Sequence, residues 1–464
     1  MLKYNRHTRT LEAEDFEYPL KDVGTPEYYD SIFPEGKVPL TSFNQRHVPM
    51  APAPEIWITD TTFRDGQQAM PPFTTEQIVA LYKLQHRLGG LRGLIRQCEF
   101  FLYQERDREA VRRCLDLGYE FPEVTGWIRA THKDFALAKA MGLREVGILT
   151  SVSDYHIFHK WEGMTRRKAL EQYLSVIKDA LSVGIIPRCH FEDITRADFY
   201  GFVVPFAIEL RRLSEESGIQ IKIRACDTMG FGVPYPGAGM PRSVPGIIYG
   251  LNHLAGVPSE LLEWHGHNDF HKVVVNSATA WLYGCSAVNG TLLGIGERTG
   301  NAPIEGMVME YLTLRGPSED VDTTVISEIA RYMRDEVHYH IPENQPFVGA
   351  HFNTTLAGIH ADGLSKDQRI YTIFDTKALL GVPPGIRISD KSSLAGVAYW
   401  INTTLELEGD EAVTKLDPAV EGIYKNIAKQ YESGRVAVMS DVELLNMLID
   451  HKPELAEKAK THLP

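Results

Sequence analysis

Residues 145–191 read EVGILTSVSDYHIFHKWEGMTRRKALEQYLSVIKDALSVGIIPRCHF and set the pattern for most of the chain. The segment opens with a short run rich in Val and Ile at 145–149, and a similar run returns at 185–191. Between them, apolar residues recur with helical spacing over 166–183. A short apolar run, an amphipathic helix and a second apolar run together predict two parallel strands joined by a helix.

The same strand–helix unit is repeated along the chain. We predict strands at 56–59, 94–100, 123–126, 145–149, 185–191, 219–225, 261–265 and 287–291. Helical patterns lie between them at 75–88, 106–117, 166–183 and 198–216, and Thr74 with Gln77 has the spacing of a capping box. Eight α/β units over roughly 250 residues favour a (β/α)₈ TIM barrel. A doubly wound open sheet is the rival fold, because it uses the same local pattern.

The sequence divides into three parts. Residues 1–53 are polar and weakly periodic, and we expect an N-terminal extension there. Residues 54–318 carry the strand rhythm and should form the TIM-barrel catalytic domain. Residues 319–464 should form a mainly helical C-terminal region, with a helix at 323–339 and a short helical tail from residue 417. The glycine-containing stretch between them, to about residue 394, looks rich in loops and unable to form a core of its own.

Composition limits the possible partners. The formal net charge of -13 argues against broad binding to nucleic acid or to an anionic membrane, since both need a basic face. The sequence has no apolar run long enough to cross a bilayer and no signal-peptide core at its start, so a cytoplasmic protein is expected. The five cysteines are scattered without a CxxC pair, which suits reduced thiols.

The strongest local signal is the segment WHGHND at 264–269. Alternate side chains of an extended segment share a face, so His265 and His267 should point the same way at the end of the seventh strand. Two imidazoles so placed can chelate a divalent metal, although HxH pairs also arise by chance. Barrel active sites lie at this rim, which favours a metal site. Asp65, after the first strand, can supply an oxygen ligand, and Arg64 can hold a carboxylate, unless the two only pair in a solvated loop.

Four further segments end predicted strands or follow the barrel. In RCHFED at 188–193, Arg188, His190 and Glu192 alternate and should share a face, which is costly unless they serve a site or pair with one another. In CDTMG at 226–230, Thr228 can donate to a carboxylate, with a plain turn as the alternative. GIGERTGN at 294–301 is either an anion-binding loop or a tight turn, and GIHADG at 358–363 says little by itself.

Together these segments resemble the family of metal-dependent acyltransferases and lyases that includes isopropylmalate synthase, homocitrate synthase and hydroxymethylglutaryl-CoA lyase. TTFRDGQQ at 61–68 is similar to the strand-one signature of that family, and HGHND at 265–269 to its metal-binding signature. The lyases carry a catalytic cysteine in the loop after the eighth strand. That loop reads GIGERTGNA here, as in the synthases, so a lyase is disfavoured.

The resemblance implies a role for each matching residue. The metal ligands would be Asp65, His265 and His267. The substrate-binding residues would be Arg64, Gln68, Arg188, His190, Thr228 and Asn301. The catalytic residues would be Glu192, His360, Arg64 and Tyr371, with Glu192 and His360 as candidates for proton transfer whose acid and base roles stay open. In the synthases the His of the GIH segment reaches the active site of the partner subunit, which implies a homodimer with shared active sites.

Within the synthases, the DGQQ segment, the insertion VPYPGAGMPRSVPG at 233–246 and the N-terminal extension are most similar to those that form citrate with Re-face specificity. The implied reaction joins acetyl-CoA to a 2-oxo dicarboxylic acid with the help of a divalent metal, Mn²⁺ or else Co²⁺, Mg²⁺ or Zn²⁺. A polar pocket favours oxaloacetate as acceptor. Homocitrate synthase and isopropylmalate synthase activities are the alternatives, and a non-catalytic metal-binding scaffold is the alternative of another class.

Overall fold

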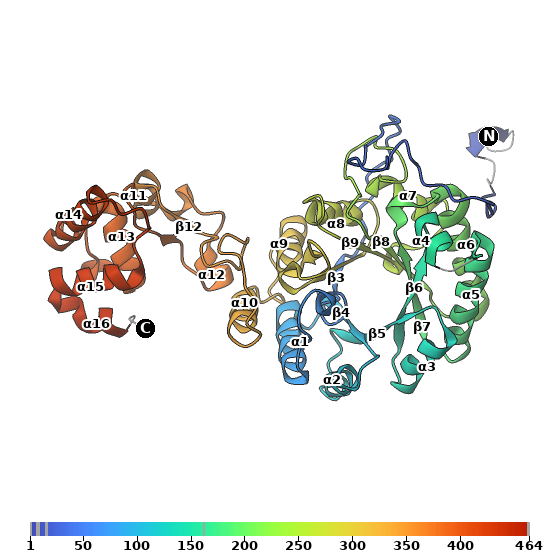
Figure 1. The fold of residues 1–464 in the computed structure, drawn as a ribbon, viewed down its shortest axis with the longest axis horizontal. Helices are drawn as coiled ribbons and strands as arrows, with labels where there is room; N and C mark the ends of the chain where they lie inside the picture. The colour runs from blue at the N-terminus through green and yellow to red at the C-terminus, as the bar shows by residue number, and fades with distance from the viewer. Residues whose placement is uncertain (1, 6–9, 14–16, 161–162, 462–464) are drawn as a thin grey trace. The chain divides into compact units, whose positions relative to one another are not determined.

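The computed structural model describes residues 2–5, 10–13, 17–160 and 163–461, which fall into two compact units, Met1–Asp322 and Thr323–Pro464. The first unit is built around eight parallel strands (Figure 1). These are β3 (Trp57–Asp60), β4 (Ile95–Phe101), β5 (Glu123–Arg129), β6 (Glu145–Ser151), β7 (Ile186–Glu192), β8 (Lys222–Asp227), β9 (Leu262–Gly266) and β10 (Ala287–Thr291). They pair in chain order, and β10 pairs with both β9 and β3. The sheet therefore closes into a (β/α)₈ barrel, and the open-sheet alternative is excluded.

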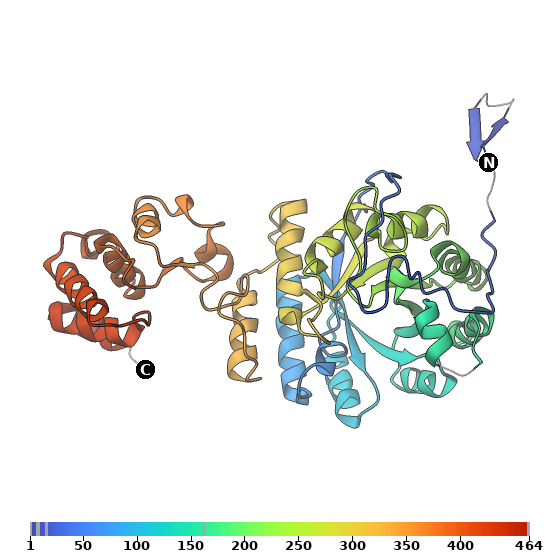
Figure 2. The same ribbon diagram turned by 45° about the horizontal axis from the view of Figure 1, so that its top comes forward.

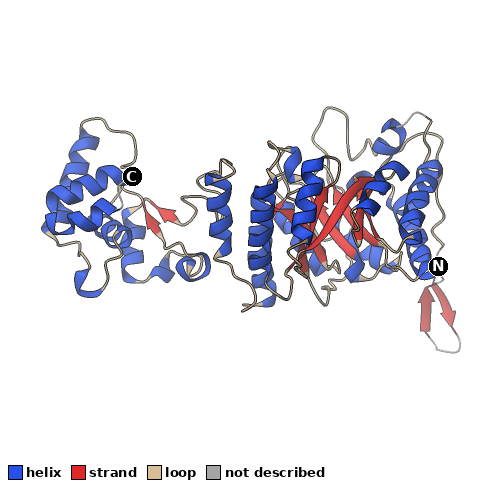
Figure 3. Ribbon diagram, turned by 90° about the horizontal axis from the view of Figure 1, so that it is seen from below, coloured by secondary structure: helices blue, strands red, loops and turns tan. Residues whose placement is uncertain are grey.

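Helices surround this barrel, as the view coloured by secondary structure shows (Figure 3). They are α1 (Thr75–Gly89), α2 (Glu105–Leu115), α3 (His132–Ala140), α4 (Asp154–Lys160), α5 (Arg166–Ser182), α6 (Val204–Ser217), α7 (Val244–His253), α8 (Val273–Leu282) and α9 (Ile304–Arg315). The predicted capping box is present, because the Thr74 side chain accepts from the Gln77 amide and the Gln77 side chain accepts from the Thr74 amide. The described helices include none that is both long and apolar enough to cross a membrane.

Shorter elements complete the first unit. They are the strands β1 (Leu2–Asn5), β2 (Thr10–Ala13) and β11 (Ala302–Pro303), and the single-turn helices η1 (Gly66–Gln68), η2 (Ile194–Arg196), η3 (Phe199–Val203), η4 (Ser259–Leu261) and η5 (Leu292–Gly294). From residue 17 onward, the N-terminal extension runs along the barrel (Figure 2). Its backbone amides at Lys21, Asn44 and Ala53 donate to the carbonyls of Gly201, Gly237 and Trp281.

The second unit is mainly helical. It contains α10 (Val325–Asp335), α11 (Gly358–Lys366), α12 (Thr376–Leu380), α13 (Leu394–Thr404), α14 (Pro418–Glu432), α15 (Asp441–His451), α16 (Ala456–Thr461), η6 (Gln368–Ile370), η7 (Gly409–Glu411), η8 (Pro453–Leu455) and the paired strands β12 (Thr354–Thr355) and β13 (Gly385–Ile386). The stretch between α10 and α13 is rich in loops, as expected, and its longest element is α11. The buried apolar residues of α11 pack against helices that follow this stretch in the chain. Ala361 and Leu364 of α11 are buried in one hydrophobic cluster with residues of α13, α14 and α15.

Candidate metal centre and active site

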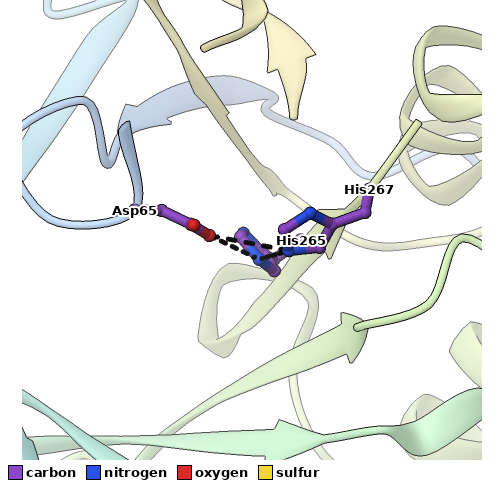
Figure 4. A group of neighbouring side chains, drawn as sticks. All are labelled: Asp65, His265 and His267. Carbon is purple, nitrogen blue, oxygen red and sulfur yellow. Dashed lines mark hydrogen bonds and ion pairs between the residues drawn. The ribbon is translucent and has the colours of Figure 1, made fainter. Parts of the chain in front are cut away.

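Three side chains converge at the end of the barrel where the strands terminate (Figure 4). Asp65 lies in the turn after β3, His265 in β9, and His267 directly after β9. Asp65 Oδ2 is 3.3 Å from His265 Nε2 and 3.6 Å from His267 Nε2, and the two Nε2 atoms are 3.3 Å apart. The three residues are 2%, 4% and 6% exposed. The structure thus brings together the three ligands expected from the sequence, in a group that can hold a metal ion.

Hydrogen bonds to neighbouring side chains orient this group. His265 Nδ1 is 2.7 Å from Asn289 Oδ1, and an amide oxygen only accepts, so Nδ1 carries the proton and the lone pair of Nε2 is free to ligate. Asn289 is itself fixed, since its Nδ2 donates to the carbonyl and the hydroxyl of Thr59. Asn301 Nδ2 lies 3.3 Å from Asp65 Oδ2. Asn289 was not predicted from the sequence, because a single Asn within an apolar strand belongs to no recognisable motif.

The charge states suit a divalent cation. Burial and, to a smaller extent, the neighbouring His265 lower the pKa of His267 to about 4, so the ring is neutral at physiological pH. Burial acts to raise the pKa of Asp65, but Arg64 and the two imidazoles outweigh it and hold that pKa well below its usual range. His267 Nδ1 is buried and has no hydrogen-bond partner among the described residues. One carboxylate and two imidazoles with free lone pairs fit a divalent metal.

Arg64 lies beside this group and is held by a buried carboxylate. Its Nε donates to Glu99 Oε2 at 3.0 Å, and its Nη1 is 3.6 Å from Asp65 Oδ2. Burial acts to raise the pKa of Glu99, but Arg224 and other cations hold that pKa well below its usual range. Sequence reasoning missed Glu99. A lone acidic residue inside the apolar strand run QCEFF was the available signal.

Arg188 lies deep inside the barrel, not at the rim. Its Nη1 donates to Gln97 Oε1 at 2.7 Å and its Nη2 to Glu99 Oε1 at 2.8 Å. Nη1 is also 3.0 Å from Glu145 Oε1, and the residue is 1% exposed. The guanidinium of Arg188 is therefore engaged with carboxylates of the barrel. Its Nε lies 3.4 Å from Glu263 Oε2 and has no hydrogen-bond partner among the described residues, so the expected contact of Arg188 with a substrate carboxylate stays a prediction.

His190 lies two residues further along β7, on the same face. Its Nε2 is 3.2 Å from Glu99 Oε1. Burial lowers its pKa to about 3, and the charge of Arg224 acts in the same direction, so the imidazole is neutral. The ring passes over Gly147 of β6, where an added Cβ would lie 2.6 Å from His190 Nε2. The glycine at this position therefore makes room for the histidine.

Glu192 ends β7 and faces α4, a helix that sequence reasoning left out of the site. Glu192 contacts Ser151 and the Lys160 ammonium, and its Oε2 is 3.3 Å from His156 Nδ1. Burial acts to raise its pKa, but His156 and Lys160 outweigh burial and lower that pKa to about 2. Thr228 lies near Glu192, because its hydroxyl accepts a hydrogen bond from the backbone amide of the next residue, Asp193, at 2.9 Å.

The remaining expected site residues are distributed between the two units. Gln68 lies in η1, three residues beyond Asp65, with an exposed side chain. His360 and Tyr371 both lie in the second unit, where their rings stack with centroids 3.8 Å apart. Thr355 Oγ1 is 3.2 Å from His360 Nδ1. The structure therefore brings His360 and Tyr371 together with each other.

Comparisons with known proteins identify the family of the chain. A family model described as HMGL-like matches residues 55–333. The chain is 57% identical to the citrate (Re)-synthase of Syntrophus aciditrophicus (strain SB), over 98% of this chain and 73% of that protein. It is 51% identical to the citrate (Re)-synthase of Clostridium kluyveri, over 96% of this chain and 98% of that protein. It is 34% identical to the 2-phosphinomethylmalate synthase of Streptomyces hygroscopicus, over 90% of this chain and 95% of that protein.

Proposed function

The chain belongs to the HMGL-like family, and we propose that it condenses acetyl-CoA with oxaloacetate and hydrolyses the product to citrate and CoA, as a citrate (Re)-synthase. Similarity over nearly the full chain to two citrate (Re)-synthases supports the choice of substrates. The convergence of Asp65, His265 and His267 at the barrel rim is the observation that carries the chemistry. A non-catalytic metal-binding scaffold would keep the same donor set, so turnover, and not metal binding, separates it from an enzyme.

The donor set is proposed to hold a divalent cation, with Mn²⁺ preferred and Co²⁺, Mg²⁺ and Zn²⁺ as alternatives. When bound, such a cation supplies Lewis-acid polarisation of the carbonyl of the 2-oxo acid. The protein contributes the fixed position of the ligands. Asn289 sets the tautomer of His265, and Arg64 and Asn301 both lie close to Oδ2 of the Asp65 carboxylate.

The rest of the reaction is proposed to use charged side chains at the rim. Arg64, fixed by Glu99, presents a guanidinium that can orient a carboxylate or an enolate oxygen of the substrates. The acetyl methyl group loses a proton to a base, and its carbon forms the new C–C bond with the keto carbon. The carbonyl electron pair becomes an alkoxide that takes up a proton. Water then attacks the thioester, the C–S bond breaks, and CoA leaves as the thiol. Glu192 and His360 are the proposed proton-transfer residues.

Acceptor choice is tested by following free thiol release with acetyl-CoA and a panel of 2-oxo acids, with products identified by mass. We expect the highest kcat/KM with oxaloacetate. If 2-oxoglutarate is preferred by tenfold or more, about 1.4 kcal/mol of transition-state preference, the protein is a homocitrate synthase instead. Turnover should also need the metal, so full activity of the metal-stripped enzyme would contradict the proposed site.

The active site is proposed to be shared between two subunits. On the second unit, apolar side chains are exposed next to His360 and Tyr371, including Ile359 at 80%, Ile370 at 59% and Ile373 at 67%. Exposed apolar groups that cluster in this way mark a surface that a partner covers. We propose that a second copy covers it and receives His360 in its barrel.

Mixed dimers test the shared site. Asp65→Ala removes a metal ligand from its own barrel, whereas His360→Ala removes a residue from the barrel of the partner, so each variant alone should be nearly inactive. In a mixed dimer one site carries both lesions and the other carries neither. Random exchange makes about half of the dimers mixed, so activity should return to roughly a quarter of wild type. Mixed dimers must be verified by co-expression with two tags, and if these show no recovery the shared site is rejected.

A further inference from the structure

A segment of the N-terminal extension, residues 17–33, runs against the helix α4, and we call this segment the strap. The backbone amide of Glu27 donates to Asp154 Oδ2 at 2.7 Å. The Tyr28 hydroxyl is 2.7 Å from His159 Nε2, and their rings stack with centroids 5.7 Å apart. The Tyr155 hydroxyl donates to the carbonyl of Tyr28 at 2.8 Å. The strap therefore contacts α4 at its start, its second residue and near its end.

The strap is itself anchored to the barrel. Arg166, fully buried at the start of α5, donates to the carbonyl of Lys21 at 3.0 Å and pairs with Asp154 at 2.7 Å and Asp198 at 2.9 Å. The amide of Lys21 donates to the carbonyl of Gly201 at 2.8 Å. These bonds fix the strap at a position that does not depend on α4 alone.

Besides the strap, α4 also contacts the candidate active site. Lys160 pairs with Glu192, and His156 lies between two carboxylates, with Nδ1 3.3 Å from Glu192 Oε2 and Nε2 3.6 Å from Asp193 Oδ2. The helix α4 has seven residues, of which only Asp154 and Ile157 are buried. A helix this short is unstable alone, so its position depends on contacts with its neighbours.

We propose that Tyr28 of the strap is a positioning residue that, through Tyr155 and His159 of α4, holds His156 and Lys160 against Glu192. The inference rests on the proposed catalytic role of Glu192. A second contact route supports it. The guanidinium of Arg196 lies 4.0 Å from the centre of the Tyr155 ring and 2.9 Å from Asp193.

Loss of the strap contact should change the electrostatics of Glu192 as well as its position. Glu192 is faced by His156 and Lys160 from α4, by Tyr173 from α5 and by Cys226 from β8. Of these groups, His156 and Lys160 from α4 are the ones that lower the pKa of Glu192. If α4 moves away, burial is no longer opposed, and the pKa of Glu192 rises from about 2.

The test uses the full chain with Tyr28→Ala, Tyr28→Phe and, as a matched control, Tyr18→Ala. Tyr18 lies in the same strap but stacks on Tyr200 of η3, with centroids 6.3 Å apart, and not on α4. For Tyr28→Ala we expect kcat to fall by about 10- to 100-fold with KM for oxaloacetate within about twofold, as for a misplaced group. The acid limb of the kcat pH profile should move to higher pH. Tyr28→Phe keeps the ring and should recover most of kcat, and Tyr18→Ala should match wild type.

A readout that needs no turnover completes the test. Hydrogen exchange followed by mass spectrometry should show faster exchange of residues 154–160 in Tyr28→Ala than in Tyr18→Ala, with both proteins folded by circular dichroism. Equal loss of kcat in the two variants, or unchanged exchange and pH profile in Tyr28→Ala, would overturn the inference. The variant Glu192→Gln distinguishes failure of the proposed catalytic role of Glu192 from failure of the strap inference. If it is fully active, the proposed role of Glu192 fails and the inference fails with it. If it is inactive while Tyr28→Ala behaves as wild type, only the strap inference fails.

Discussion

Replacement of Asn289 by Leu should weaken metal binding without touching a ligand. Leu has nearly the same volume, but it cannot accept from His265 Nδ1, which is 2.7 Å from Asn289 Oδ1. The His265 ring then loses the bond that fixes its tautomer and orientation. Loss of such a partner typically costs 10- to 100-fold in metal affinity, or about 1.4 to 2.7 kcal/mol. The metal-free protein should also lose stability, because the His265 N–H is left buried and unpaired, at about 1–3 kcal/mol.

The control for this change is Asn276→Leu. Asn276 is also a buried Asn, but its Nδ2 donates to the carbonyl of Gly232 at 3.0 Å and makes no contact with the metal ligands. Both variants should unfold at lower denaturant concentration than wild type, and only Asn289→Leu should lose affinity in a calorimetric titration with Mn²⁺. If folded Asn289→Leu binds the metal within twofold of wild type, the role assigned to Asn289 is refuted.

Three further changes test the site and the fold. His267→Ala should lower metal affinity and turnover together, whereas His253→Ala, at an exposed position at the end of α7, should leave both unchanged in the same titration. Gly147→Ala should cost about 1–3 kcal/mol of stability, since the new methyl group would lie 2.6 Å from His190 Nε2, and a wild-type melting temperature would contradict the crowding. Thr74→Ala should lower the free energy of unfolding by about 1 kcal/mol through loss of the α1 cap, and Thr74→Ser should restore it.

The barrel was predictable because its signal is local. Strands buried on both faces appear as short apolar runs, and the run predicted at 287–291 matches β10 (Ala287–Thr291) in both bounds. The alternation of side chains along β9 also placed His265 and His267 on one side of the strand. Closure of the sheet was not predictable in the same way, because the pairing of β10 with β3 joins residues about 230 positions apart.

Depth along a strand explains the partners of Arg188. The alternation of side chains along β7 correctly placed Arg188 on the same face of the strand as Glu192. The face of a residue does not determine how far it lies from the barrel rim. Four residues of strand span about 13 Å, so Arg188 lies a full layer below Glu192 in the barrel interior. There it meets Glu99 from β4 and Glu145 from β6, partners that no sequence spacing relates to β7. The charged side chains buried inside the barrel thus pair with one another. Such pairing is one of the two ways in which the cost of burying them can be offset.

The helix α11 shows how tertiary burial overrides local preference. GIHADG is poor in helix formers, and two glycines in six residues oppose a helix by roughly 1 kcal/mol each, so the segment looked like a loop. In the structure Ala361 and Leu364, three residues apart, face the core of the second unit, and their burial compensates. The same helix leaves Ile359 exposed and stacks His360 on Tyr371. His360 is therefore presented by a folded surface, so its proposed insertion into a second barrel needs docking of preformed parts and no coupled folding.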